Sequence, residues 1–182
     1  EFKEVIALAE NFTGEEFHRN IRIAAYRQLA SAQLRDGDPD AAAASAENVL
    51  AFEKLSAWDA FDANMTLAQV YQKKKDYDRA EHYARNAASG PENSGSRRWA
   101  WWIVVNSCKA SGQSKQKQCS VLRTILEDPV ISGRDKVDFR LAYIYLLDPE
   151  KDKVKIGQQI KLCKKETLSP SQKKQIQALE AK

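Results

Sequence analysis

Hydrophobic residues recur along this chain with the period of an α-helix, in segments that polar turns separate. Between residues 61 and 93, two such segments meet across the short polar turn from Lys73 to Asp76. One face of the first segment holds Leu67, Ala68 and Tyr71, and one face of the second holds Ala80, Tyr83, Ala84 and Ala87. Asp76 or Asp78 can cap the second helix. This stretch therefore predicts a helical hairpin.

The same helical period predicts further helices on both sides of this hairpin. The expected segments are residues 1–12, 15–35, a helix from Pro39 through Leu50, one from Trp99, one after Gly112, one through 139–146, one through 154–163, and a last one beyond Ser169 and Pro170. Residues 94–98 form the loosest linker. No alternation of Val, Ile and Thr recurs, so we expect an all-α protein.

Pairs of a Leu-like residue followed by a small one mark an internal repeat. Leu29-Ala30, Leu67-Ala68, Val104-Val105 and Leu141-Ala142 are 38, 37 and 37 residues apart. This constant spacing indicates about four helical hairpins in succession, and the small residues suit the points where paired helices cross closely.

The central hairpin resembles a tetratricopeptide repeat (TPR). The family's pattern is met by Leu67-Ala68, Tyr71, Ala80, Ala87 and Pro91. A family repeat usually takes ~34 residues, so each repeat here is lengthened by about one helical turn. The resemblance implies a right-handed α-α superhelix, a solenoid of about four hairpins with a C-terminal capping helix, in one domain over residues 1–182.

The expected parts of that domain follow from the repeat spacing. They are a leading helix at 1–14, repeats at 15–53, 55–93, 97–130 and 134–166, and the capping helix at 169–182. The leading helix fits the second helix of a truncated preceding repeat. The last helix carries many Lys and Gln residues, as a polar-backed cap of a solenoid does.

The resemblance also implies a binding groove on the concave side of the first helices. The matching residues are Arg27, Gln28, Ser31, Met65, Thr66, Gln69, Trp99, Trp102, Ile103, Asn106, Phe139, Arg140 and Tyr143. Two interpretations of the aromatic members stay open. Trp99, Trp102, Phe139 and Tyr143 anchor a partner segment, as aromatic residues at interaction hot spots do, or they pack in the core, since aromatic spacings of three and four are common there.

The sequence carries no enzyme motif. It lacks GxGxxG, GxxxxGK[ST], GxSxG and HExxH patterns. Its two histidines, His18 and His82, lie in different repeats, and neither is flanked by a Ser or Cys arranged as a nucleophile pair. We therefore expect no catalysis and no cofactor.

Three cysteines permit at most one disulfide within the chain. Cys108 and Cys119 flank the turn of the third hairpin almost symmetrically, so they can face each other and form a bridge in an oxidising compartment. The alternative is that they are small buried thiols at helix crossings. The spacing of the cysteines does not suit a tetrahedral metal site, so no metal is expected.

Charge is distributed unevenly along the chain. Residues 1–90 carry 11 Lys and Arg against 15 Asp and Glu, whereas residues 91–182 carry 18 against 10. The lysines of the basic half, Lys151, Lys153, Lys155, Lys161, Lys164 and Lys165, either bind nucleic acid or another anionic polymer or lie scattered on solvated helix faces.

The function expected from these features is that of a non-catalytic scaffold. Its groove would hold a protein or peptide partner within a larger assembly, and nucleic-acid binding is the alternative. No apolar run reaches the ~18 to 20 residues of a membrane helix, so we expect a soluble protein. The chain begins at Glu1 without Met, as a processed chain or an excised fragment does. The sequence leaves the compartment and the oligomeric state open.

Overall fold

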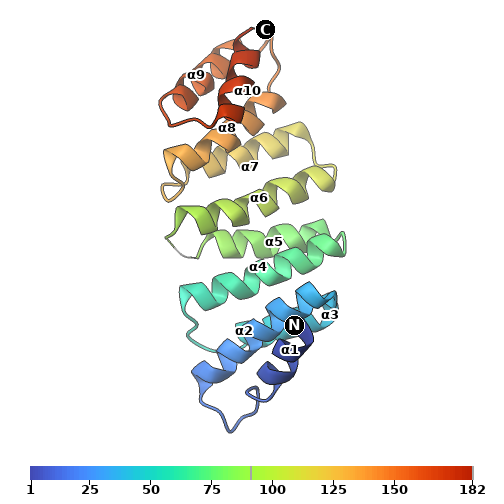
Figure 1. Ribbon diagram of the computed structural model, residues 1–182. Helices are drawn as coiled ribbons and strands as arrows, with labels where there is room; N and C mark the ends of the chain where they lie inside the picture. Colours follow the sequence, from blue (N-terminus) through green and yellow to red (C-terminus); the bar gives the residue numbers. More distant parts are fainter. Residues whose placement is uncertain (91, 182) are drawn as a thin grey trace. The chain divides into compact units, whose positions relative to one another are not determined.

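The computed structural model describes residues 1–90 and 92–181, and within these ranges every regular element is an α-helix (Figure 1). The helices are α1 (Phe2–Glu10), α2 (Arg19–Asp36), α3 (Pro39–Leu50), α4 (Ala57–Lys73), α5 (Tyr77–Ala88), α6 (Ser94–Ala110), α7 (Lys115–Glu127), α8 (Gly133–Leu146), α9 (Lys153–Lys164) and α10 (Pro170–Glu180). The predicted all-α fold is confirmed.

Contacts between residues group the chain into two compact units. Unit 1 comprises Glu1–Pro91 and Trp99–Ser111, and unit 2 comprises Glu92–Arg98 and Gly112–Lys182. Helix α6 contributes its first residues to unit 2 and the remainder to unit 1. The expected single domain and its repeat boundaries stay predictions.

In unit 1 the helices pack in the order of the sequence. Helix α1 packs on α2, α2 packs on both α3 and α4, and α4 also contacts α3 and α5. Small side chains are fully buried in α3 and α5, where Ala42, Ala46, Ala80 and Ala84 have no exposed surface. Because these residues end at Cβ, the helix axes can approach to the short end of the usual range.

The first two hairpins of unit 1 repeat each other closely. A shift of 38 residues carries the start of α2 onto the start of α4, and it carries Pro39–Leu50 of α3 onto Tyr77–Ala88 of α5. The caps repeat as well, since Asp38 accepts a hydrogen bond from the N–H of Ala41 and Asp76 accepts one from the N–H of Arg79. The predicted cap at Asp76 is confirmed.

In unit 2, helix α8 contacts α7, α9 and α10. The core of this unit consists of Val137, Leu141, Ile144, Ile160, Cys163 and Ile176. The last helix, α10, has only Ile176 buried, as expected of a capping helix. It begins with a capping box in which Ser169 and Gln172 satisfy each other's backbone N–H groups, and Pro170 occupies its first position.

Two predicted helix starts were wrong. The helix expected from residue 15 begins at Arg19, because His18 caps it by accepting a hydrogen bond from the N–H of Asn20. Residues 94–98, expected to be a linker, form the first turn of α6, since the side chain of Asn93 accepts the N–H of Ser96 at 3.0 Å. The predicted closing residue of the second repeat, Pro91, lies outside the described residues.

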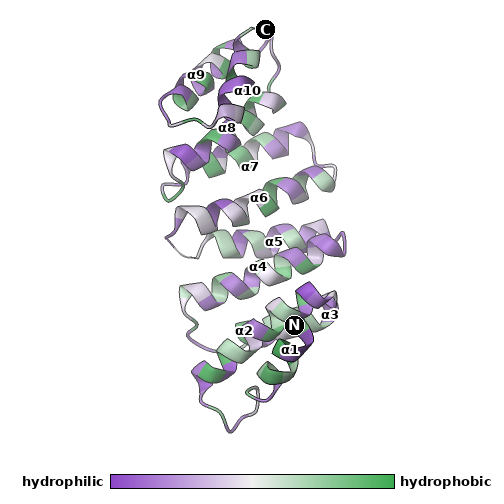
Figure 2. Cartoon of the chain, viewed as in Figure 1, coloured by the Kyte–Doolittle hydropathy of each residue, from purple (hydrophilic) through white to green (hydrophobic). Residues whose placement is uncertain are grey.

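The helices of both units contain apolar as well as polar residues. Figure 2 shows apolar and polar residues mixed along the helices rather than segregated into helices of one kind. Among the described residues, no helix combines the length and the hydropathy needed to cross a membrane.

Candidate functional site

A groove of about 360 Å³ lies in unit 1, along first helices of successive hairpins. Helices α2 and α4 supply most of its lining, and α6 supplies Trp99. The lining residues are Arg27, Gln28, Ser31, Leu34, Arg35, Asp62, Met65, Thr66, Gln69, Lys73 and Trp99. We call this hollow the first-helix groove.

The first-helix groove has an apolar floor, polar walls and an aromatic edge. Met65 and Leu34 are 3 % and 6 % exposed, so they form part of the packed interior beneath the groove. The amide side chains of Gln28 and Gln69 are more accessible. Trp99 is 54 % exposed, an unusually large apolar surface for one side chain to present to water.

Cations outnumber carboxylates along the groove lining. Arg27 of α2 donates to Asp59 Oδ1 at 2.8 Å and also to Asp62, so it ties α2 to α4 and is neutralised there. Lys73 Nζ donates to the carbonyl oxygen of Leu34 at 2.9 Å, and Arg35 is exposed. A carbonyl oxygen does not neutralise the charge of Lys73, and the charge of Arg35 faces water. The end of the groove near these two cations therefore favours acidic ligands.

Several residues that the sequence predicts for the site come together in this groove. Arg27, Gln28, Met65, Gln69 and Trp99 all line it. Trp102 and Asn106 lie further along α6 and do not belong to the lining. That any of these residues binds a partner stays a prediction.

The predicted residues on α8 do not present an open surface. Phe139 is fully buried and Tyr143 is only 8 % exposed, so neither ring can anchor a partner. For these two residues the packing interpretation is the right one, because both rings are enclosed by the fold. Arg140 is half-buried, and its Nη1 donates to the carbonyl oxygen of Gly133 at 3.5 Å.

Sequence reasoning missed four residues of the groove lining: Leu34, Arg35, Asp62 and Lys73. A signal for two of them was present, since Arg35 and Lys73 are 38 residues apart and thus hold the same position in successive repeats. A cation at an equivalent place in two repeats indicates a shared face of the groove.

The lysines proposed for nucleic-acid binding lie on α9 or next to one of its ends. Lys155 Nζ contacts Asp152 at 2.7 Å and Lys164 Nζ contacts Glu180 at 2.5 Å, so two of the six are paired with carboxylates. At 3.6 residues per turn, the spacing of Lys153, Lys155 and Lys161 distributes them around the helix rather than along one side. This arrangement is typical of solvated helix faces.

The histidines and cysteines have structural contacts. His82 Nε2 lies 3.2 Å from the side-chain nitrogen of Asn86. Cys108 is buried, and its Sγ lies 3.3 Å from Glu81 Oε2. Cys108, Cys119 and Cys163 are all free thiols in the structure. A bridge between Cys108 and Cys119 under oxidising conditions stays a prediction. Within residues 1–90 and 92–181, no group of three or more His, Cys, Asp or Glu side chains is placed to hold a metal ion.

Comparison with known proteins identifies the class of fold. No protein-family model matches the sequence, and no curated protein matches it. Among solved structures, the chain is similar to the crystal structure of a putative kinesin light chain from Podosopora anserina with nearly identical TPR-like repeats. The TM-score is 0.61 at 17 % identity, and the match covers 99 % of this chain and 84 % of that one. A second crystal structure, of a variant of that protein, gives a TM-score of 0.60 at 16 % identity with the same coverage.

These similarities show the fold. The chain has a TPR-like helical repeat fold, as its repeat spacing and the Leu67-Ala68 hairpin indicate. Folds of this class generally mediate protein interactions through extended surfaces built from successive repeats.

Proposed function

We propose that this protein is a non-catalytic scaffold that holds a segment of a partner protein in the first-helix groove. The observation that carries the proposal is the convergence of Gln28, Gln69 and the exposed indole of Trp99 on one groove along α2, α4 and α6. The fold supports it, because stacked helical hairpins present surfaces of this kind.

The chemistry of the groove defines the partner segment. An apolar or aromatic side chain covers the exposed face of Trp99, because burying a rigid indole removes much apolar surface from water with few torsions to immobilise. Acidic side chains of the partner segment lie near Arg35 and Lys73. These two cations steer the approach of the segment and fix its direction in the groove. The amides of Gln28 and Gln69 pair with its backbone.

A peptide library selected on the purified protein tests this function. We expect selected peptides to combine an aromatic or aliphatic residue with Asp or Glu. Their affinity, measured by calorimetry, falls at least tenfold in the Trp99→Ala variant. Trp58→Ala is the matched control, since Trp58 is 48 % exposed on α4 and does not line the groove. Peptides whose binding survives Trp99→Ala and Arg35→Glu unchanged would contradict the proposal.

The competing function predicts a different dependence on salt. A protein that binds phosphates through the lysines of α9 releases counterions, so its affinity for a single-stranded oligonucleotide falls steeply as salt rises. The aromatic groove depends little on salt. We expect oligonucleotide binding to be weak. The combined variant Lys153→Ser, Lys161→Ser and Lys165→Ser should abolish it and leave the affinity for peptides unchanged.

A further inference from the structure

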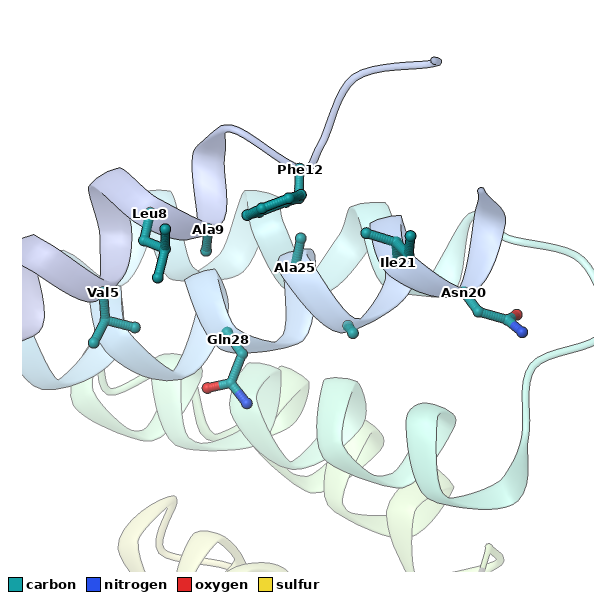
Figure 3. A pocket seen from close by; sticks show the side chains of 9 residues that line it. Val5, Leu8, Ala9, Phe12, Asn20, Ile21, Ala25 and Gln28 are labelled. Atoms are coloured by element: carbon teal, nitrogen blue, oxygen red, sulfur yellow. The ribbon is translucent and has the colours of Figure 1, made fainter. Parts of the chain in front are cut away.

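A second hollow of about 570 Å³ lies in unit 1 between α1 and α2, and its lining is almost entirely apolar (Figure 3). Val5, Leu8 and Phe12 contribute from α1 and the residues just after it, and Ile21 contributes from α2. Their exposed fractions are 40 %, 63 %, 39 % and 46 %. Figure 3 shows these four side chains around one depression, which we call the α1–α2 hollow.

The repeat register shows what covers the equivalent residues of α3 and α5. When the 38-residue shift that relates α3 to α5 is applied to α1, it places α1 within the span of α3, and Leu8 then corresponds to Ala46 and to Ala84. Ala46 and Ala84 have no exposed surface. Ala46 belongs to a core cluster with Ile23, Ala30 and Leu34 of α2, the first helix of the same hairpin. The exposed face of α1 is therefore the face that α3 buries beneath α2.

The α2 side of the hollow follows the same register. Ile21 and Ala24 of α2 correspond to Asp59 and Asp62 of α4. These two carboxylates are where α4 receives Arg27 of α2. The two sides of the hollow, on α1 and α2, thus correspond to surfaces of α3 and α4 one repeat later. Helix α2 covers both of those surfaces.

We propose that the α1–α2 hollow binds an amphipathic helix of a partner protein, in the position that α2 takes on α3 and α4. Bound there, the helix continues the stacking interface of unit 1 by one element. This proposal does not depend on the first-helix groove, because the two surfaces share only Gln28 of α2 and the aromatic edge at Trp99 is absent from the hollow.

The residues of the hollow specify the chemistry of that helix. An apolar side chain replaces Arg27 in it, because Ile21 and Ala24 stand where α4 has carboxylates and an arginine there would lack a counter-charge. A Lys or Arg lies near its C-terminal end, where α2 has Gln33. The side-chain amide of Gln33 lies 2.7 Å from Ser45 Oγ and 3.0 Å from the carbonyl oxygen of Ala41, which places this end of α2 over the first turns of α3.

The charge complement for that cation is Glu4. It corresponds to Ala42, which has no exposed surface beneath α2. A carboxylate covered in this way needs a cation beside it, because burying an unpaired charge is costly. The cation also suits the negative end of the helix dipole.

A peptide with the sequence of α2 itself provides the probe. The test peptide comprises residues 19–36 with the substitutions Arg27→Leu and Gln33→Lys, and the matched control peptide keeps Arg27 and carries Gln33→Glu. We expect saturable binding of the test peptide to the whole protein by fluorescence anisotropy, with a gain in helical circular dichroism, and at least tenfold weaker binding of the control peptide.

Protein variants then locate the site. Leu8→Glu and Ile21→Glu weaken the test peptide at least tenfold, and both positions are exposed enough for the protein to stay folded. Val154→Glu is the control, since Val154 is 76 % exposed on α9 of unit 2. Trp99→Ala leaves the binding of this peptide unchanged, so the failure of this proposal and the failure of the proposed function are distinguishable.

Four results would overturn the proposal. The test and control peptides bind equally, or Leu8→Glu has no effect on binding. Sedimentation shows a dimer that Leu8→Glu dissociates, which assigns the hollow to a second copy. A Leu8→Cys variant, made in the natural source and purified without partners, resists maleimide, which means that the same polypeptide already covers the hollow.

Discussion

Arg27 shows how one side chain holds successive repeats together. Its guanidinium reaches two carboxylates of α4, Asp59 and Asp62, across the contact between first helices. All three side chains are partly open to water, at 35 %, 21 % and 40 % of their surface, so solvent screens the attraction.

We expect Arg27→Met to lower the free energy of unfolding by about 0.5–1 kcal/mol. Methionine keeps much of the aliphatic packing of arginine while it removes the charge. Urea denaturation measures the change, and a double-mutant cycle with Asp59→Asn isolates the pair. A coupling energy of zero in that cycle would show that the ion pair does not stabilise the stack.

The three cysteines should differ in their reactivity. Burial raises the pKa of the Cys163 thiol, and burial likewise raises the pKa of Cys119 although the charge of Arg123 opposes it. Thiolate is the reactive form, so these two thiols react slowly near pH 7. We expect Cys119, which is half-buried, to react with Ellman's reagent before the buried Cys108 and Cys163, and three thiols to titrate in urea. A disulfide bridge between Cys108 and Cys119 would leave only the thiol of Cys163 to titrate.

Single residues also mark the limit of what the sequence could predict. The repeat register placed Arg27, Gln28, Met65, Gln69 and Trp99 on one groove, because equivalent positions of stacked helices face the same side. It could not separate Trp99 from Phe139, since the local spacing of the two aromatic residues is similar. Their exposure differs, at 54 % against 0 %, because neighbouring elements cover one ring and not the other.

At the scale of elements, the caps determine where helices begin. Asp76 accepts hydrogen bonds from the backbone N–H of Arg79 at 3.1 Å and from its side chain at 2.5 Å. The backbone hydrogen bond, followed by the side-chain one, lowers the pKa of Asp76 below its usual 3.8. The ionised carboxylate therefore favours the folded state at neutral pH.

The pH dependence of this cap has a definite sign. Because the folded state has the lower pKa, the stabilising contribution of Asp76 is complete above about pH 4 and is lost as the pH falls through the folded pKa. We expect the Asp76→Asn variant to lose less stability than the natural protein between pH 5 and pH 2, as urea unfolding at each pH would measure. Asp78→Asn is the control, and indistinguishable profiles for all three proteins would refute a role for the cap.

The start of α6 shows why helix boundaries were harder to predict than helices. Ser94, Gly95 and Ser96 have low helix propensity, so the sequence indicated a linker. In the fold, contacts distant in sequence offset that propensity. Ser94 hydrogen-bonds to Asp135, and Arg97 pairs with the buried carboxylate of Asp128 at 3.2 Å. These partners lie more than 30 residues away, where local patterns carry no information.

At the scale of the molecule, stability should be distributed locally. Most helices contact their neighbours in the sequence, and the additional pairs, α2 with α4 and α8 with α10, are also close along the chain. Repeat proteins with such nearest-neighbour contacts respond to a mutation mainly near the altered element.

Ile176→Ala tests this locality. Ile176 is 2 % exposed and is the buried residue of α10, so its truncation costs about 2–4 kcal/mol in its own unit. We expect hydrogen exchange, read by mass spectrometry, to accelerate at least tenfold in α8, α9 and α10 and less than twofold in α2 to α4. The half-buried Leu179→Ala serves as a milder control. Equal acceleration throughout the chain would mean that the protein unfolds as one cooperative block.

The recurrence of helix boundaries at intervals of 38 residues has an evolutionary consequence. Duplicating one hairpin in the gene keeps the reading frame and the lengths of the helices, so new copies arise easily. Their order is constrained, however, because Arg27 of α2 pairs with Asp59 and Asp62 of α4, the first helix of the next hairpin. The equivalent positions of α2 hold Ile21 and Ala24, which cannot pair with an arginine. Recombination that shuffles the copies would join mismatched faces, and selection would remove such genes.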